Sequence, residues 1–451
     1  MTSRRDGGTL LCVAMATAFV TCAAPATALC ADMFDADSPW MFGDWNGQRS
    51  ELAERGYTFK LDYVGEAGAN VHGGYNHDHV ARYSDQIALG AHLDLQKILG
   101  WRGADFQLTV TDRNGSNISN DRINDPRVGG FTSAQEVWGR GQIWRLTQLW
   151  YRQTFLDDKL DIKVGRFGEG EDFNSFPCDF QNLAFCGSQV GNWAGSIWYN
   201  WPVSQWAMRV KYHLTPQLYA QIGAFEQNPS NLDNGNGFKL SGSGTQGALV
   251  PVELVWTPQV NGLPGEYRAG YYYSSANATD VYKNANGTPA ALSGGDYRSA
   301  SSKHGLWLGA RQQVTSLASD GSRGLSLFGN LTLHDKKTNA IDQYVQAGVV
   351  YKGLFDARPA DDIGLGLARV HVNPAYRHNA EAVNQANAAF DYDNPDYLPV
   401  QRTEYSAELN YGLHLANWLT LRPNVQYIRH PGGVSEVDDA FIAGLKIQAS
   451  F

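Results

Sequence analysis

The chain has 451 residues, of which 43% are hydrophobic and 12% aromatic, with 36 basic and 45 acidic side chains. A net charge of −9 argues against nucleic acid as a partner. After the N-terminus, no apolar run approaches the roughly 18–20 residues of a membrane-spanning helix, which excludes a helical membrane protein.

The first thirty-one residues have the features of a secretory signal peptide. Two arginines precede an apolar stretch at 10–22, and a small-x-small cleavage site follows at 26–28, with a weaker one at 29–31. We predict a signal peptide at 1–31, cleaved between residues 28 and 31. Its removal leaves 34 basic and 44 acidic side chains, a net charge of −10.

Residues 32–56 are predicted to form an N-terminal periplasmic segment with one short helix. Residues 48–55, QRSELAER, are helix formers, and Gly56 is a good C-terminal stop. This is the only helix that we predict after the signal peptide. A helix this short is unstable alone, so it should pack on or inside a larger body.

From Tyr57 onward, apolar and polar residues alternate with a period of two, which is typical of β-strands. The pattern predicts sixteen strands, at 57–71, 86–97, 104–113, 143–155, 159–167, 205–214, 217–227, 247–257, 265–275, 304–316, 324–335, 343–354, 361–373, 404–414, 417–430 and 439–451. Residues 196–201 allow a seventeenth, but the segment is short and Pro202 ends it.

The connections between these strands sort by parity. Links after even-numbered strands are short, whereas most links after odd-numbered strands are long, among them 114–142, 168–204, 276–303 and 374–403. Tight periplasmic turns alternate with long extracellular loops in outer-membrane barrels. We therefore predict an all-β fold, a sixteen-stranded antiparallel transmembrane β-barrel spanning 57–451, in the bacterial outer membrane.

The two faces of the predicted strands differ in chemistry. Arg209 and Lys211 alternate with apolar residues in one strand, and Lys446 and Gln448 alternate with apolar residues in the last. Burying such groups unpaired costs several kcal/mol each, so we expect the inner face to meet water. Sixteen strands enclose an aqueous lumen. The outer row of the last strand, ending at Phe451, should meet lipid.

The longest loop, near 168–204, holds two of the five cysteines, Cys178 and Cys186. Export makes the compartment oxidising, which favours a disulfide; a zinc pair is the rival, without a second Cys/His pair nearby. We expect this loop to enter the lumen as a constriction. Its aromatic, carboxylate and amide groups suit a neutral sugar, although the aromatic rings have an alternative role in packing the loop against the wall.

Seven residues are candidates for the constriction. Four charged residues fall on predicted inner faces, and three residues belong to the loop or border it; in that order they are Glu66, Glu253, Arg311 and Glu408, then Arg166, Asp172 and Trp193. Opposed arginine and carboxylate groups would set a transverse field that orients hydroxylated solutes. Alternatively, these charges pair with one another and only hold the loop in place.

Three stretches resemble the carbohydrate-selective porin family, OprB. They are Gly43-Asp44-Trp45-Asn46-Gly47-Gln48-Arg49 with Leu52 and Gly56; the loop motifs Gly165-Arg166, Asp172-Phe173, Phe176-Pro177-Cys178, Phe180-Gln181-Asn182 and Phe185-Cys186-Gly187; and Glu404-Tyr405, Trp418, Arg422-Pro423, Pro431-Gly432-Gly433 and Phe451. The likeness spans nearly the whole mature chain. At Asn46 the family usually has a second glycine.

The resemblance implies an outer-membrane porin through which glucose and other small sugars diffuse passively, with extracellular loops narrowing the channel. The family often prefers sugars to ions and places arginine and glutamate at the constriction. The terminal aromatic residue resembles the signal read by the barrel assembly machinery. Small sugars, outer-membrane lipid and that machinery are the expected partners, without a cofactor, a metal or nucleic acid.

Other functions have weaker support in the sequence. His72, His77 and His79 cluster in the first long loop, and Glu169, Glu171 and Asp172 lie close together in 168–204. Neither spacing defines a metal site or a glycosidase pair. A polysaccharide hydrolase and a general or anion porin remain the alternatives. The preferred sugar, the ion selectivity and the oligomeric state, trimer or monomer, stay open.

Overall fold

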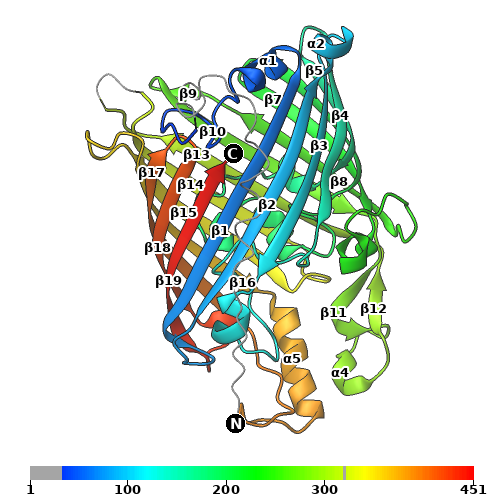
Figure 1. Ribbon diagram of the computed structural model, residues 1–451. Coiled ribbons are helices and arrows are strands. Elements are labelled where there is room, and N and C mark those ends of the chain that lie inside the picture. Colours follow the sequence, from blue (N-terminus) through cyan, green and yellow to red (C-terminus); the bar gives the residue numbers. More distant parts are fainter. Residues whose placement is uncertain (1–32, 318–320) are drawn as a thin grey trace, which may run out of the picture.

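A computed structural model describes residues 33–317 and 321–451, so the predicted signal peptide lies outside the described residues. These residues form one closed antiparallel barrel of sixteen strands (Figure 1). The strands are β1 (Tyr57–Gly74), β2 (Ala81–Asp94), β3 (Ala104–Gly115), β4 (Arg145–Phe155), β5 (Leu160–Phe167), β6 (Gln205–Thr215), β7 (Leu218–Gln227), β8 (Gly247–Trp256), β10 (Leu263–Ser274), β13 (Lys303–Gln313), β14 (Gly324–His334), β15 (Ile341–Lys352), β16 (Asp362–Val372), β17 (Thr403–Ala416), β18 (Leu419–Arg429) and β19 (Asp438–Ser450).

The predicted fold is confirmed strand by strand, with small differences at the ends. β2 begins five residues earlier than predicted, because Ala81 and its neighbours continue the ladder with β1 as far as Ala69. Residues 196–201 form no strand. Three further strands lie outside the barrel wall: β9 (Gln259–Val260) extends the turn before β10, and β11 (Ala278–Asn284) pairs with β12 (Tyr297–Ala300) in a separate hairpin.

The first and last strands close the barrel. β19 pairs antiparallel with β1, and this register places Lys446 directly opposite Glu66. The C-terminus, α1 and α2 lie at one end of the barrel, and α5 with the β11–β12 hairpin lies at the other (Figure 1). We call these the short-turn end and the long-loop end. The predicted alternation of short and long connections between consecutive strands is therefore confirmed.

The helices are short and lie outside the strand wall or within the loops. They are α1 (Gln48–Glu54), α2 (Leu95–Leu99), α3 (Gln189–Trp193), α4 (Ala290–Ser293) and α5 (Pro374–Ala386), with single helical turns at Ser119–Ile123, Glu169–Glu171, Leu183–Phe185, Pro229–Leu232, Asn234–Asn236 and Pro431–Gly433. In the part of the chain that the structure describes, none is long and apolar enough to cross a membrane.

The prediction of a single helix was wrong, and the missed signals are caps. The Asn373 side chain accepts from the Ala375 N–H, and Pro374 occupies the first turn of α5. In α2, the Asp94 side chain accepts from the backbone N–H groups of Gln96 and Lys97, which ends strand β2 there instead of at 97.

Residues 33–56 dock against the end of the closing strand. The Met41 N–H donates to the Ser450 carbonyl at 2.8 Å, and the Trp418 indole donates to the Asp35 carbonyl at 2.9 Å. The Arg49 guanidinium lies between the rings of Trp40 and Trp45, 4.1 and 4.5 Å from their centroids. We call residues 33–56 the terminal clamp, because they fasten the C-terminal strand to the first strand.

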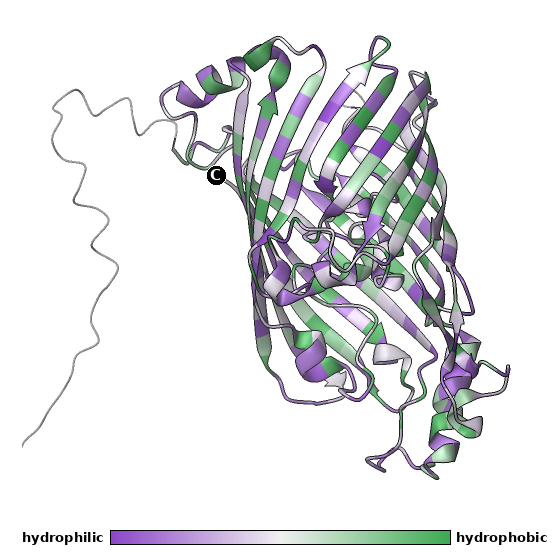
Figure 2. Cartoon of the chain, turned by 90° about the vertical axis from the view of Figure 1, so that its right-hand side faces the viewer, coloured by the Kyte–Doolittle hydropathy of each residue, from purple (hydrophilic) through white to green (hydrophobic). Residues whose placement is uncertain are grey.

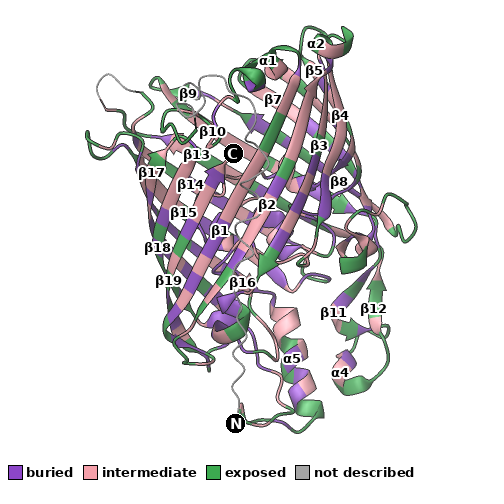
Figure 3. Cartoon of the chain, viewed as in Figure 1, coloured by how far each residue is buried: buried purple, intermediate pink, exposed green. Residues whose placement is uncertain are grey.

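The strands alternate between an apolar outer row and a polar inner row. Bands of opposite hydropathy follow one another along each strand in Figure 2, and exposed and buried bands do so in Figure 3. The exposed apolar side chains of β6 are those predicted to face outward: Trp206, Met208, Tyr212 and Leu214. This is the surface that a lipid bilayer requires.

The inner row is drier than predicted. Glu66, Glu408 and Lys446 are fully buried, although the alternation alone suggested that such groups meet water. The reason is that two loops fill the middle of the barrel and supply partners for these charges. Aromatic clusters pack between the loops and the wall, one around Phe173, Trp198 and Trp307 and another around Phe180, Trp193 and Tyr344.

Candidate functional site

Two loops from the long-loop end meet inside the lumen: residues 116–144, between β3 and β4, and residues 168–204, between β5 and β6. Two backbone hydrogen bonds join them, from Glu136 N–H to the Gln181 carbonyl at 3.0 Å and from Leu183 N–H to the Ser133 carbonyl at 2.9 Å. The predicted disulfide between Cys178 and Cys186 forms in the second loop. Because the two sulfurs are bonded to one another, the alternative of a zinc-binding cysteine pair is wrong.

Carboxylates of the wall hold both loops by their backbone. Four wall glutamates accept loop N–H groups: Glu66 from Val137 at 3.1 Å, Glu404 from Thr132 at 3.1 Å, Glu253 from Asn174 at 3.0 Å, and Glu408 from Gln181 and Asn182 at 3.0 and 2.7 Å. Charged acceptors make stronger hydrogen bonds than neutral ones. These glutamates are buried and act as anchors for the loops.

Lys446 lies at the centre of this anchoring. Its ammonium group is fully buried, 3.2 Å from Glu66 and 2.9 Å from Glu136. It also donates to the carbonyls of Cys178 and Phe180, at 3.1 Å each. One cation of the closing strand therefore joins the first strand to both loops. The expectation that Lys446 meets the water of the lumen was wrong.

Each of the remaining predicted site residues contacts different partners. Arg166 is buried and donates to the Ser204 carbonyl at 2.6 Å. Asp172 lies between Lys163 and Arg209, at 2.5 and 3.5 Å. Trp193 packs on Tyr344, with 4.9 Å between the ring centroids. Of the seven candidates, Arg311 is the one whose residue is exposed, and its guanidinium lies 5.9 Å from the Phe176 ring.

The two loops and the adjoining wall enclose a cavity of about 540 Å³, which we call the lumen pocket. It is lined by aromatic rings, amides and charges of both signs: Gln86, Arg113, Phe131, Glu136, Trp138, Arg140, Glu171, Asn192, Asn200, Trp201 and Gln448. Gln86 organises one side, because its amide oxygen accepts from Arg113 Nε at 2.8 Å and from the Trp201 indole at 2.9 Å.

A strained turn presents Arg140 to this pocket. Arg140 has a φ of 64° and stands between Gly139 and Gly141, whose φ values are 112° and 84°. Such a conformation is costly for a side chain other than glycine and is held only by its surroundings. Buried Arg145 stabilises this turn, because its Nε donates to the Arg140 carbonyl at 2.7 Å.

Sequence reasoning missed Arg113, Glu136, Trp138 and Arg140, which come from loop 116–144 and its flanking strand. The segment 136–141, EVWGRG, combines a carboxylate, an aromatic ring and an arginine between two glycines. The loop 168–204 has a similar mixture of carboxylates and aromatic rings. The sequence favoured 168–204 as the constriction because that loop is longer and contains two cysteines.

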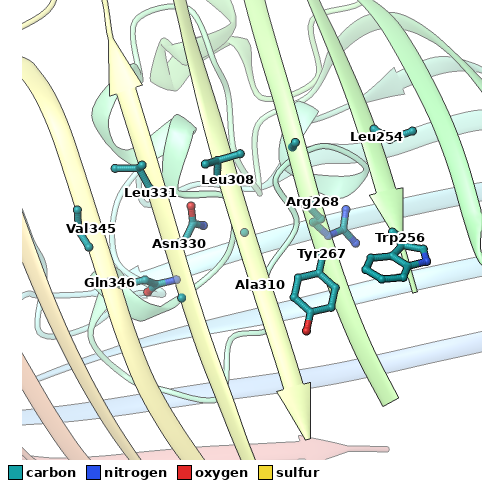
Figure 4. A pocket seen from close by; sticks show the side chains of 13 residues that line it. Leu254, Trp256, Tyr267, Arg268, Leu308, Ala310, Asn330, Leu331, Val345 and Gln346 are labelled. Carbon is teal, nitrogen blue, oxygen red and sulfur yellow. The ribbon is translucent and has the colours of Figure 1, made fainter. Parts of the chain in front are cut away.

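Other clefts lie on the outside of the barrel. The groove in Figure 4, about 560 Å³, is lined by Leu254, Leu308, Leu331 and Val345, while Asn330 and Gln346 of the same strands are buried on the inner side. It is apolar and lies on the outer face of the barrel wall. The histidines of the first loop form no group that could hold a metal ion within the described residues; His77 pairs with Asp438 at 3.1 Å.

Glu169 begins the turn that leads into loop 168–204, and its carboxyl group is fully buried. It accepts from the Tyr199 N–H at 2.9 Å. Burial raises the pKa of Glu169 to about 8, although hydrogen bonds and the charge of Arg140 favour the ionised form. The folded chain thus holds a proton here that the unfolded chain, with a pKa near 4.5, has lost at neutral pH.

This proton makes stability depend on pH. The contribution is complete below the unfolded pKa and disappears as the pH rises through about 8. We expect the Glu169→Gln variant to lose less unfolding free energy than the wild type between pH 6 and pH 9, by on the order of 2 kcal/mol. Urea unfolding in detergent micelles measures this, with exposed Glu51→Gln as control. Equal slopes for the three proteins would contradict it.

Comparison with known proteins agrees with this architecture. The sequence model of one family, described as "Carbohydrate-selective porin, OprB family", matches residues 78–451. Porin B of Pseudomonas aeruginosa is 66% identical over 423 residues, which cover 93% of each chain. A solved structure of Pseudomonas putida OprB at high pH has a TM-score of 0.92 at 67% identity, covering 93% of this chain and 100% of that one. A low-pH structure of that protein has a TM-score of 0.60.

Proposed function

The chain belongs to the carbohydrate-selective porin family, OprB, and from this premise we propose that the lumen pocket is the constriction through which small sugars diffuse. The protein is an outer-membrane sugar porin and a channel, not an enzyme. The short-turn end then faces the periplasm and the long-loop end faces the outside. Glucose and other small sugars are the proposed solutes, and their passage is passive.

One observation carries the proposal: the lumen pocket combines ring faces with donors and acceptors at the point where two loops narrow the barrel. Trp138, Trp201 and Phe131 offer faces on which the C–H groups of a sugar stack. Hydroxyl groups of a sugar find hydrogen-bond partners in amides and in charged groups of both signs. These are Asn192, Asn200 and Gln448, and Arg113, Arg140, Glu136 and Glu171. A cavity of about 540 Å³ has the size of small-ligand sites.

The seven residues predicted from sequence take two proposed roles. Arg311, exposed in the lumen, contributes to the sugar pathway. Glu66, Arg166, Asp172, Trp193, Glu253 and Glu408 shape the constriction by holding the loops, because their polar groups or rings are already engaged with loop or wall. The residues that line the lumen pocket are instead the ones proposed to contact the sugar.

The ends and surface of the barrel suggest its partners. We propose that Phe451 is read by the barrel assembly machinery before closure; in the closed barrel its ring packs on Phe42, with 5.3 Å between the centroids. Residues 32–56 then form a periplasmic segment, and 57–451 form the barrel. The exposed apolar outer row is proposed to contact outer-membrane lipid.

Liposome swelling tests the function. Wild-type protein in liposomes should admit glucose much faster than sucrose, and both rates should exceed those of protein-free liposomes. Removing a ring from the constriction, as in Trp138→Ala, should raise the sucrose-to-glucose rate ratio about threefold, because a half-buried indole then no longer narrows the passage. Trp101→Ala, an exposed indole at the short-turn end, is the matched control.

Two results would contradict the proposal. Wild-type liposomes that admit glucose no faster than protein-free liposomes would refute the channel itself. A sucrose-to-glucose ratio that stays the same in Trp138→Ala would place the constriction elsewhere in the barrel.

A further inference from the structure

The charges that line the lumen pocket are unequally neutralised. Both lining carboxylates have a lysine partner: Glu136 is 2.9 Å from Lys446, and Glu171 is 2.9 Å from Lys163. The two lining guanidinium groups, Arg113 and Arg140, have no such partner. Within residues 33–317 and 321–451, no carboxylate oxygen lies within 4.0 Å of either guanidinium.

The donors of the two arginines are also largely unused. Arg113 donates its Nε to Gln86, and its two terminal nitrogens find no acceptor among the described residues. Arg140 donates to no group in that part of the chain, and a β-carbon at Gly195 would stand 2.9 Å from its Nη2. The glycine thus leaves space for the guanidinium beside loop 168–204. Both guanidinium groups line the lumen pocket, Arg113 with 5% of its surface exposed.

The acidic group that acts on Arg140 through space does little to neutralise it at neutral pH. Glu169 acts on Arg140 through space, but its buried carboxyl group has a pKa of about 8 and is mostly protonated at pH 7. Glu136 and Glu66 act at a distance on Arg113, and these two carboxylates share the one charge of Lys446. A passing solute therefore meets two guanidinium groups that no carboxylate of the described residues contacts.

From these two unpaired guanidinium groups we infer a second class of solute: hydroxylated monocarboxylates, the sugar acids, pass through the same pocket and are favoured over amino sugars of equal size. The inference rests on the proposed function, because it places the pocket on the route. A planar guanidinium matches a carboxylate with two parallel hydrogen bonds. Partial exclusion of water strengthens this attraction and equally the repulsion of an ammonium group.

Uptake of three six-carbon solutes tests the inference. Proteoliposomes with the membrane potential clamped at zero receive radiolabelled glucose, glucuronate or glucosamine, and initial rates are measured at pH 7. We expect glucuronate to enter about fivefold faster than glucosamine, a ratio equivalent to ~1 kcal/mol. In Arg113→Gln/Arg140→Gln the ratio should fall to about one, whereas Arg140→Lys should preserve most of it because the charge remains.

The controls separate the inference from the function on which it rests. Arg102→Gln, an exposed arginine at the short-turn end, should keep the wild-type ratio. Normal glucose uptake with glucuronate no faster than glucosamine would overturn the inference and leave the sugar porin intact. Glucose uptake no faster than in protein-free liposomes would refute the porin function. A ratio unchanged in the double variant would show that other groups select the anion.

Discussion

Replacing Lys446 with methionine will destabilise the barrel by about 3–5 kcal/mol, the range seen when one partner of a buried ion pair is removed. Methionine has a similar length but leaves Glu66 and Glu136 without their shared cation, and both carboxylates lie inside the barrel. It also removes the bonds to the carbonyls of Cys178 and Phe180, so both loops lose their common tie to the closing strand.

Urea unfolding of the Lys446→Met variant in detergent micelles measures this loss. Lys60→Met is the matched control, because Lys60 lies on the neighbouring strand β1 and is exposed. Adding Glu66→Gln to Lys446→Met should recover part of the stability, since one uncompensated charge disappears. A Lys446→Met variant within 1 kcal/mol of the control would show that water enters the cluster and that it is not a dry anchor.

The second large effect is expected at the terminal clamp. Arg49 is buried between Trp40 and Trp45 and donates to the carbonyls of Phe451 and Phe59, at 2.7 and 3.3 Å. Two cation–π contacts and these hydrogen bonds together contribute about 2–4 kcal/mol. Arg49→Met should therefore lower the temperature at which the folded band disappears in heat-modifiable gel electrophoresis, since the end of β19 is no longer fastened to β1.

Arg55→Met is the matched control for the clamp. Arg55 follows the same helix and is exposed, and its ion pair is with Glu51 one turn away. The control should unfold like the wild type. If Arg49→Met did so too, the pairing of β19 with β1 would hold the C-terminus without help from residues 33–56. Hydrogen exchange at Ser450 distinguishes local fraying from global unfolding.

The strands and the closure of the barrel could be predicted from the sequence alone. The period of two in segments such as 205–214 and 439–451 depends on the local geometry of the strand, which puts successive side chains on opposite faces. Lipid outside the barrel and the polar interior then impose opposite chemistry on the two faces over many residues. The disulfide between Cys178 and Cys186 could also be predicted from the sequence, because the two cysteines lie eight residues apart in one exported loop.

The interior was decided only by tertiary structure. The alternation predicts that Lys446 and Glu408 point inward, but whether they meet water depends on loops far away in the chain. Glu408 accepts hydrogen bonds from the backbone N–H groups of Gln181 and Asn182, and Lys446 forms an ion pair with Glu136. Strand faces follow from contacts between neighbours in sequence, whereas the lumen pocket follows from two loops folding onto one wall. No local pattern records which backbone N–H groups a buried carboxylate will meet.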